Sequence, residues 1–198
     1  IISYIIDHYL DFGVSKILIA GGYKCNVIKK YFNQHKKKYP NIKVINTGLN
    51  SLTGKRILKL KNNFKKNEDF FVTYGDGLSD INLKKLLNYH KKNKKVCTLT
   101  AVRPPARFGE LKIRGRSVNA FNEKPQLNQG WINGGFFVFN YKIFNFFNNT
   151  NQMLEREPMQ KLLKNKNVNA YKHKSFWMCM DTLRDKILLE KIIKKNFF

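Results

Sequence analysis

The residues of this sequence that most clearly suggest chemistry are aspartates that follow apolar segments. Asp76 follows the apolar segment 70–74 after one residue and lies between Gly75 and Gly77. Flanking glycines allow a bulky ligand to approach the backbone. A carboxylate there suits Mg²⁺ that carries phosphate oxygens, because one or two carboxylates plus substrate phosphates usually hold this ion. An ordinary Asp-Gly turn is an equally good interpretation of the same residues.

A second acidic candidate, Asp181, precedes the last predicted helix of the chain. Asp181 or Thr182 could simply cap that helix, with Asp185 adding favourable charge in its first turn. However, Asp181 follows a run of large apolar residues, where a carboxylate without a partner is costly. A metal ion shared with Asp76 would offset that cost, so capping and metal binding both remain open.

A polar loop containing two glycines precedes another predicted helix and superficially resembles a phosphate-binding P-loop. The comparison fails because five residues separate Gly48 from Gly54 where the motif has four, and Arg56 stands where the motif has Ser or Thr. A loop that enters a helix can still offer the Ser51 and Thr53 hydroxyls and the Arg56 guanidinium to a phosphate or a ribose. The alternative is a loop that only turns the chain.

Two further segments combine polar side chains with turn residues. Glu123 and Lys124 could hold a hydroxyl-rich phosphorylated ligand, the acid accepting from hydroxyls and the base contacting phosphate. An exposed acid–base pair at a turn explains them as well. Asn133 followed by two glycines allows a ligand to approach the backbone closely, or marks a bulge at the start of an aromatic strand.

Composition restricts the class of protein that carries these residues. The 198 residues contain 38 Lys plus Arg against 13 Asp plus Glu, a net charge of +25, yet 42% of them are apolar. This apolar content supports one globular domain spanning residues 1–198. Only seven of the basic residues are Arg and the lysines are dispersed, so we expect a solvated basic surface and no nucleic-acid partner. Three scattered cysteines favour a reducing, cytoplasmic setting, and the lack of a long apolar run argues against membrane insertion.

Hydrophobic periodicity predicts the elements that must position these side chains. Strand-like and helix-like segments alternate over the first hundred residues, which indicates an α/β domain around a mostly parallel sheet, and additional strands in the second half make the sheet mixed. The predicted helices cover residues 1–10, 26–35, 55–64, 81–92 and 182–194, and the predicted strands cover 16–21, 42–45, 70–74, 96–102, 111–113, 118–121 and 136–139.

The order of the motifs is more informative than any one of them. Together they closely resemble the glucose-1-phosphate cytidylyltransferases, a group within the sugar-phosphate nucleotidyltransferase family. The resemblance covers almost the whole chain, and it rests on Thr47-Gly-x-x-x-x-Thr53-Gly-x-Arg56, Thr73-Tyr-Gly-Asp-Gly77, Pro104-Pro-x-Arg-Phe-Gly109, Glu123-Lys-Pro125, Trp131-Ile-Asn-Gly-Gly-Phe-Phe137, Glu155-Arg-Glu-Pro158 and Phe176-Trp-x-x-Met-Asp-Thr-Leu-Arg-Asp185.

This resemblance implies a fold, a reaction and a set of site residues. The fold would be a Rossmann-like nucleotidyltransferase domain with a mixed, mostly parallel sheet flanked by helices. The reaction would be Mg²⁺-dependent transfer from CTP to α-D-glucose 1-phosphate, giving CDP-glucose and pyrophosphate for bacterial surface polysaccharide (O-antigen) synthesis. By matching motifs, the metal ligands would be Asp76 and Asp181, and the substrate and nucleotide site would contain Ser51, Gly75 and the catalytic Arg56. By broader similarity within the family, Glu123 would hold the glucose hydroxyls, Lys124 would hold the phosphate, and Gly109 and Asn133 would line the sugar pocket.

The sequence also departs from the family pattern. The first strand, the glycine-rich signature loop and the following Pro-Lys-Pro segment of the family have no counterpart here, so we expect an N-terminally truncated enzyme with little or no turnover. Lys55 stands where the family usually has Gly, and the stretch 32–46 is shorter than in better-known members, where it contributes to contacts within a homo-oligomer. The alternatives are a relative using another nucleoside triphosphate or sugar phosphate, and a non-catalytic module that binds nucleic acid or sugar nucleotides.

Overall fold

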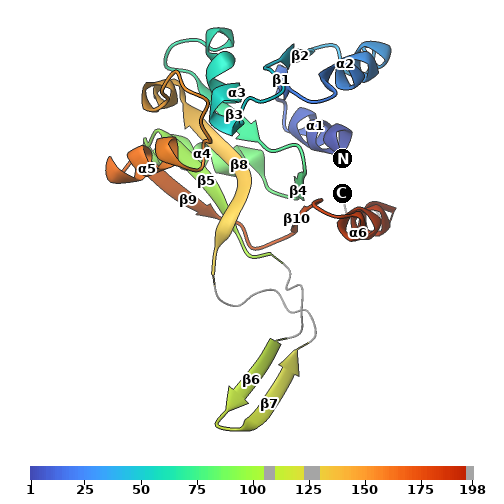
Figure 1. Cartoon of the computed structure of the whole chain (residues 1–198), viewed down its shortest axis with the longest axis vertical. Coiled ribbons are helices and arrows are strands. Elements are labelled where there is room, and N and C mark those ends of the chain that lie inside the picture. Colours follow the sequence, from blue (N-terminus) through green and yellow to red (C-terminus); the bar gives the residue numbers. More distant parts are fainter. Residues whose placement is uncertain (105–109, 123–129, 195–198) are drawn as a thin grey trace.

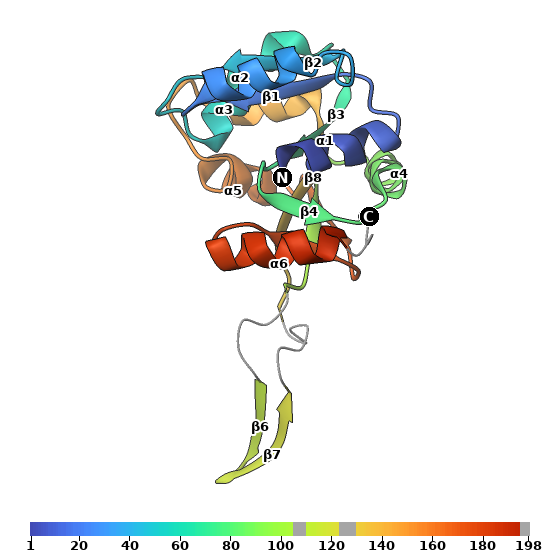
Figure 2. The same cartoon turned by 90° about the vertical axis from the view of Figure 1, so that its right-hand side faces the viewer.

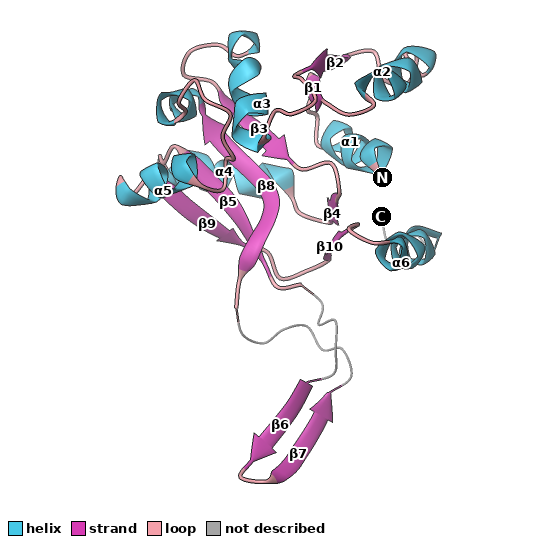
Figure 3. Ribbon diagram, in the orientation of Figure 1, coloured by secondary structure: helices cyan, strands magenta, loops and turns pink. Residues whose placement is uncertain are grey.

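The computed structural model describes residues 1–104, 110–122 and 130–194 as a mixed α/β fold (Figures 1 and 3). The helices are α1 Ile2–Asp11, α2 Cys25–Gln34, α3 Thr53–Lys59, α4 Leu83–Asn93, α5 Glu157–Lys164 and α6 Leu183–Lys194, with 3₁₀ turns η1 Lys61–Asn63 and η2 Tyr141–Phe146. The strands are β1 Ile17–Gly21, β2 Ile42–Asn46, β3 Asp69–Thr73, β4 Gly77–Ser79, β5 Cys97–Val102, β6 Glu110–Arg114, β7 Ser117–Asn122, β8 Ile132–Asn140, β9 Val168–Lys172 and β10 Trp177–Cys179.

A four-stranded sheet forms the centre of the molecule, in the order β3-β8-β5-β9. Strand β8 is antiparallel to both of its neighbours and β5 is parallel to β9, so three of these strands run in one direction. Strands β1 and β2 form a separate parallel pair under α2, and β4 and β10 form a short antiparallel pair beside α6 (Figures 1 and 2). The predicted mixed, mostly parallel α/β fold with flanking helices is therefore confirmed.

Strand β8 separates two hydrophobic clusters because successive side chains of a strand point to opposite faces of its sheet. Phe136 and Val138 belong to the cluster formed with α1, α4 and α6. Phe137 and Phe139, both fully buried, belong to the cluster formed with η2 and α5. A third cluster, centred on Ile6, joins α1 to α2 and to the β1–β2 pair. The aromatic run of β8 thus anchors both faces of the central sheet.

Most of the predicted elements are confirmed within a few residues, and the differences have local causes. The helix predicted to reach residue 64 ends at Lys59, because the chain tightens into η1 and Phe64 turns back to stack on Phe70 with ring centroids 4.1 Å apart. The strand predicted at 136–139 begins earlier, at Ile132, where it pairs with the end of β5.

Four elements were not predicted. Strands β4 and β10 contain three residues each, which is too short for a periodic pattern to show. In β9, polar Asn169 and Lys172 interrupt the apolar residues, so no strand pattern is evident, and α5 has a polar sequence whose main helix signal is Pro158 in its first turn.

Strands β6 and β7 pair as a hairpin that is drawn apart from the central sheet in Figure 3. No helix in the described ranges has the length and apolar character needed to cross a membrane.

Candidate active site

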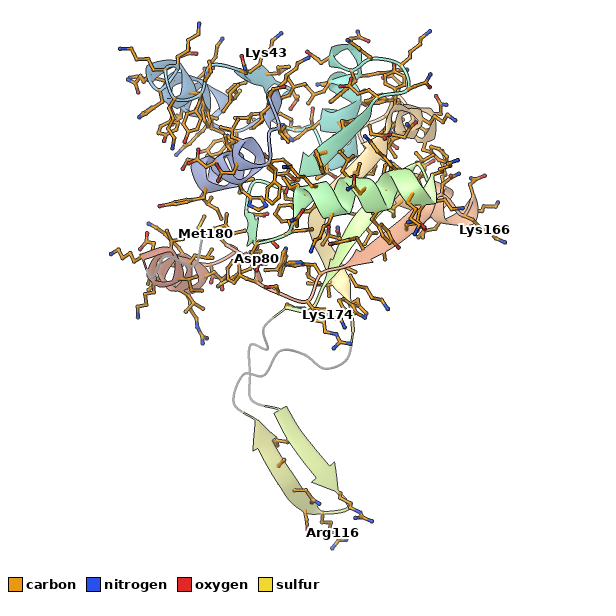
Figure 4. All side chains as sticks on the ribbon, turned by 180° about the vertical axis from the view of Figure 1, so that it is seen from behind. Lys43, Asp80, Arg116, Lys166, Lys174 and Met180 are labelled. Atoms are coloured by element: carbon orange, nitrogen blue, oxygen red, sulfur yellow. The ribbon has the colours of Figure 1, made fainter. Side chains whose placement is uncertain are left out.

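The short β4–β10 pair brings together the two aspartates that the sequence singled out. Asp76 immediately precedes β4, Asp181 lies two residues beyond β10, and Gly77 is paired with Cys179. The backbone continues this pairing by one further contact, in which the Met180 N–H donates to the Asp76 carbonyl oxygen at 2.9 Å. Figure 4 shows Met180 where the chain leaves β10 for α6. Residues that are more than one hundred positions apart in sequence therefore lie side by side.

The negative charge of Asp181 acts on the carboxylate of Asp76. Partial burial raises the pKa of Asp76 above its usual value, and the negative charge of Asp181 raises it further. The Cys179 thiol donates to Asp181 Oδ2 at 3.3 Å. Burial, this hydrogen bond and the surrounding carboxylates raise the pKa of Cys179 to about 11, so the thiol stays protonated at neutral pH. The site therefore concentrates negative charge, and a bound cation would reduce the repulsion between the carboxylates.

The start of α6 shows which side chains cap that helix. Thr182 and Asp185 form a reciprocal cap, in which Asp185 Oδ2 accepts from the Thr182 N–H at 2.9 Å and Thr182 Oγ1 accepts from the Asp185 N–H at 3.2 Å. The carboxylate of Asp181 is therefore not the cap. Both Asp76 and Asp181 are exposed, so the apolar run before Asp181 does not bury its carboxylate and gives no reason of its own for a metal there.

The chemistry of these donors fits Mg²⁺. Both are hard carboxylate oxygens, and each is accessible to solvent and ligands. Within the described ranges, no group of three or more His, Cys, Asp or Glu side chains could form a metal cage. Two carboxylates without such a cage suit an ion that takes its remaining ligands from phosphate groups and water. The assignment of Asp76 and Asp181 as metal ligands stays a prediction.

Arg56, predicted to act on substrate, lies within the structure of the neighbouring turns. Its Nη1 donates to the Gly21 carbonyl at 3.0 Å and to Thr47 Oγ1 at 2.6 Å, and its Nη2 donates to the Leu49 carbonyl at 3.3 Å. A Cβ at Gly22 would lie 2.4 Å from Nη2, so a side chain there would displace the guanidinium. In the described part of the chain, these contacts connect Arg56 with β1 and the 47–49 turn and not with Asp76.

Ser51 belongs to the same turn. Its hydroxyl donates to the Thr47 carbonyl and accepts from Lys59 Nζ at 3.1 Å, and Lys59 Nζ also donates to the Thr47 carbonyl at 2.6 Å. The structure brings Ser51 and Arg56 together around Thr47. Their predicted role in binding substrate stays a prediction, as does that of Gly75, beside which a Cβ would meet no atom within 4 Å.

Asn133 is connected directly to the segment that carries Asp76. Its Nδ2 donates to the hydroxyl of Tyr74 at 3.2 Å, and its Oδ1 accepts from the Gly135 N–H at 3.0 Å. The Tyr74 hydroxyl in turn donates to Glu155 Oε1. Sequence reasoning gave no role to Tyr74 or Glu155, although both occur in the motifs that carry the family resemblance. Gly109, Glu123 and Lys124 lie outside the described residues.

A cluster of Ser79, Asp80 and His173 beside β4 superficially resembles a hydrolase triad. Ser79 Oγ lies 3.1 Å and Asp80 Oδ1 lies 2.9 Å from the same ring atom, His173 Nε2. A triad requires the serine and the carboxylate on different ring nitrogens, because the histidine must take a proton on one while the other is held. This cluster instead ties β4 to the loop after β9, and Figure 4 shows Asp80 in that position.

Two sequence comparisons relate the chain to known proteins. The sequence model of the family described as nucleotidyl transferase matches residues 1–185. The chain is 37% identical to the glucose-1-phosphate cytidylyltransferase of Salmonella typhimurium over an alignment 217 residues long, gaps included. The alignment covers 99% of this chain and 84% of that protein.

Solved structures show the same fold. HddC from Yersinia pseudotuberculosis superimposes with a TM-score of 0.70 at 22% identity, covering 96% of this chain and 84% of that one. A UDP-glucose pyrophosphorylase complexed with UDP-glucose gives a TM-score of 0.66 at 16% identity, covering 98% of this chain and 86% of that one.

Proposed function

Because this chain belongs to the nucleotidyl transferase family, we propose that its site serves Mg²⁺-dependent transfer of a cytidylyl group from CTP to α-D-glucose 1-phosphate. The products are CDP-glucose and pyrophosphate. The choice of substrates rests on the 37% identity, over nearly the whole chain, with a glucose-1-phosphate cytidylyltransferase. Relatives that use another nucleoside triphosphate or sugar phosphate share the fold, so the choice is open to direct test.

The observation that carries this proposal is the meeting of Asp76 and Asp181 beside the β4–β10 pair. The reaction brings several phosphate groups together, and its main difficulty is their negative charge. When bound, Mg²⁺ supplies charge neutralisation for the phosphoryl oxygens and orients the leaving pyrophosphate. The two carboxylates are the side chains suited to hold that ion.

The remaining chemistry is positioning, which the chain supplies with its own residues. A phosphate oxygen of glucose 1-phosphate attacks the α-phosphorus of CTP and pyrophosphate leaves, so no covalent enzyme intermediate is required. We assign contact with the sugar to Asn133, whose amide donates to the Tyr74 hydroxyl. Arg56 supports this geometry by holding the Thr47–Leu49 turn against the end of β1, where Ser51 also lies.

The same proposal includes the setting of the protein. A cytoplasmic location follows from the substrates, because CTP and sugar phosphates are cytoplasmic metabolites, and from the scattered cysteines. Assembly as a homo-oligomer and a role in bacterial surface polysaccharide synthesis follow from the family resemblance alone.

Binding of the product nucleotide sugar tests the function without requiring turnover. Calorimetric titration of the chain with CDP-glucose at fixed ionic strength should show binding with Mg²⁺ that EDTA abolishes. CDP-glucose should bind more tightly than UDP-glucose or dTDP-glucose. Absence of Mg²⁺-dependent binding would contradict the proposal. Binding to nucleic acid that weakens steeply with salt would instead support the non-catalytic alternative.

Turnover is a separate question from binding. Pyrophosphate release from CTP and glucose 1-phosphate by the purified protein measures it directly. Appreciable release that requires Mg²⁺ would support the proposed function.

A further inference from the structure

We infer that Glu155 and Tyr74 are positioning residues for the sugar, acting through Asn133. This inference rests on the proposed function and extends it to side chains that the sequence left without a role. Tyr74 lies at the end of β3, Asn133 near the start of β8, and Glu155 in the segment before α5. Three separate parts of the chain therefore meet in one hydrogen-bonded network beside Asp76.

The direction of each hydrogen bond is set by the chemistry of its groups. Asn133 Nδ2 donates to the Tyr74 oxygen, and the Tyr74 hydroxyl donates its proton to Glu155 Oε1. The other carboxylate oxygen, Glu155 Oε2, accepts from Thr53 Oγ1 at 2.7 Å. Both oxygens of Glu155 thus accept a hydroxyl proton. Burial and the bond to Glu155 raise the pKa of Tyr74, so its hydroxyl keeps the proton that it donates.

Gly135 makes the position of the Tyr74 ring possible. A Cβ at Gly135 would lie 2.4 Å from Tyr74 Cδ2, closer than any side chain tolerates, and its φ of +77° is in the left-handed region that favours glycine. The ring therefore lies directly against the backbone of β8, where its hydroxyl reaches the Asn133 amide. The two glycines that follow Asn133 thus serve this close approach as well as the strand itself.

Glu155 is in turn anchored to the start of α3. Thr53 Oγ1 accepts from the Leu154 N–H at 2.9 Å while donating to Glu155, and the Lys55 N–H donates to the Gln152 carbonyl at 3.1 Å. Gly54 permits this contact, because a Cβ there would lie 2.9 Å from the Gln152 carbonyl oxygen. The carboxylate is therefore a fixed acceptor, and Tyr74 is oriented by a rigid neighbour.

The consequence for a ligand lies in the orientation of the Asn133 amide. Its Oδ1 accepts from the Gly135 N–H and one Nδ2 proton goes to Tyr74, which fixes the plane of the amide on an exposed side chain. One N–H donor and one oxygen lone pair remain on that amide. A donor and an acceptor held side by side match two neighbouring sugar hydroxyls. The network therefore selects how the hexose is held and leaves the nucleotide and the metal to other residues.

A matched pair of ligands separates the sugar from the nucleotide. Tyr74→Phe removes the hydroxyl that fixes Asn133 and should weaken Mg²⁺-dependent binding of CDP-glucose about tenfold, the equivalent of one hydrogen bond of about 1.4 kcal/mol, while binding of CDP stays within twofold of wild type. Glu155→Leu, which removes the acceptor of the Tyr74 proton at similar size, should show the same selective loss. Tyr89→Phe is the control, since the Tyr89 hydroxyl donates to the Ala170 carbonyl away from the site.

A double-mutant cycle distinguishes positioning from a general structural role. If Tyr74 acts through Asn133, then Tyr74→Phe should change CDP-glucose binding less than twofold in a protein that already carries Asn133→Ala. Equal loss of CDP and CDP-glucose, full additivity in the cycle, or unchanged CDP-glucose binding in both Tyr74→Phe and Glu155→Leu would overturn the inference. If the wild type itself does not bind CDP-glucose, the proposed function fails and the inference fails with it. The circular dichroism spectrum of each variant establishes that it is folded.

Discussion

Gly54 offers the sharpest test of how α3 is packed. Helix propensity and packing predict changes of opposite sign in the free energy of unfolding for Gly54→Ala. Alanine is a better helix former than glycine by about 1 kcal/mol, so helix propensity alone predicts stabilisation. Gly54 is buried in the first turn of α3, however, and a Cβ would lie 2.9 Å from the Gln152 carbonyl oxygen and 3.1 Å from the Leu154 nitrogen. Both are backbone atoms, which cannot rotate away.

The packing cost should exceed the gain in helix propensity. Forcing the 152–154 segment outward costs about 1–3 kcal/mol, as overpacking usually does. The same movement weakens the bonds from Thr53 Oγ1 to Glu155 and from the Leu154 N–H to Thr53, each worth about 1 kcal/mol. After the propensity gain is subtracted, we expect Gly54→Ala to lower the free energy of unfolding by about 2 kcal/mol.

Urea unfolding followed by circular dichroism measures this difference. Asn88→Ala is the control, because Asn88 is exposed within α4 and its replacement should add about 0.5 kcal/mol through propensity alone. If Asn88→Ala behaves in this way and Gly54→Ala is as stable as wild type or more so, the packing described for α3 is wrong.

Three further predictions follow from the core, from the thiol beside the site and from the cap of α6. Phe137→Ala should lower the free energy of unfolding by about 3–5 kcal/mol, because this ring is fully buried in the cluster that β8 forms with η2 and α5. Val27→Ala, at an exposed position, should change it by less than about 0.5 kcal/mol. Similar urea midpoints for the two variants would contradict the core assignment. The pKa of Cys179 is raised from 9.0 to about 11, so at pH 8 alkylation of its thiol should be about one hundred times slower in the folded protein than in urea. The rate in the folded protein should increase as the pH rises towards 11. Fast alkylation of Cys179 at pH 8, located by mass spectrometry, would refute this. Thr182→Ala should cost about 1 kcal/mol through loss of the reciprocal cap with Asp185, and an unchanged thermal midpoint would show that the cap does not stabilise α6.

Local patterns predicted most of the framework, because its elements are long enough to show a period. The apolar face of α1 and the apolar residues of β1, β3 and β5 are visible in sequence. Strands β4 and β10 are not, since three residues have no periodicity and each is a strand only because the other pairs with it. These two strands are also the ones that bring Asp76 and Asp181 together.

In the candidate site too, some features follow from local sequence and others depend on contacts between distant residues. The sequence could propose Asp76 and Asp181 because each stands at the end of an apolar segment, but it could not choose between capping and metal binding for Asp181. Only side-chain geometry shows that Thr182 and Asp185 cap α6, and metal binding by Asp181 stays a prediction. The contact of Tyr74 with Glu155 joins residues 81 positions apart and leaves no local pattern. Only their shared presence in family motifs pointed to them.

Divalent-metal binding tests the central claim most directly. Mn²⁺ can stand in for Mg²⁺ and be counted by electron paramagnetic resonance in the presence of CDP-glucose. The account predicts one Mn²⁺ bound by wild type and displaced by Mg²⁺, and at least about tenfold weaker binding in both Asp76→Asn and Asp181→Asn. Asp11→Asn, at the exposed end of α1, should bind as wild type does. Wild-type Mn²⁺ affinity in both site variants would contradict the claim that these two carboxylates hold the ion.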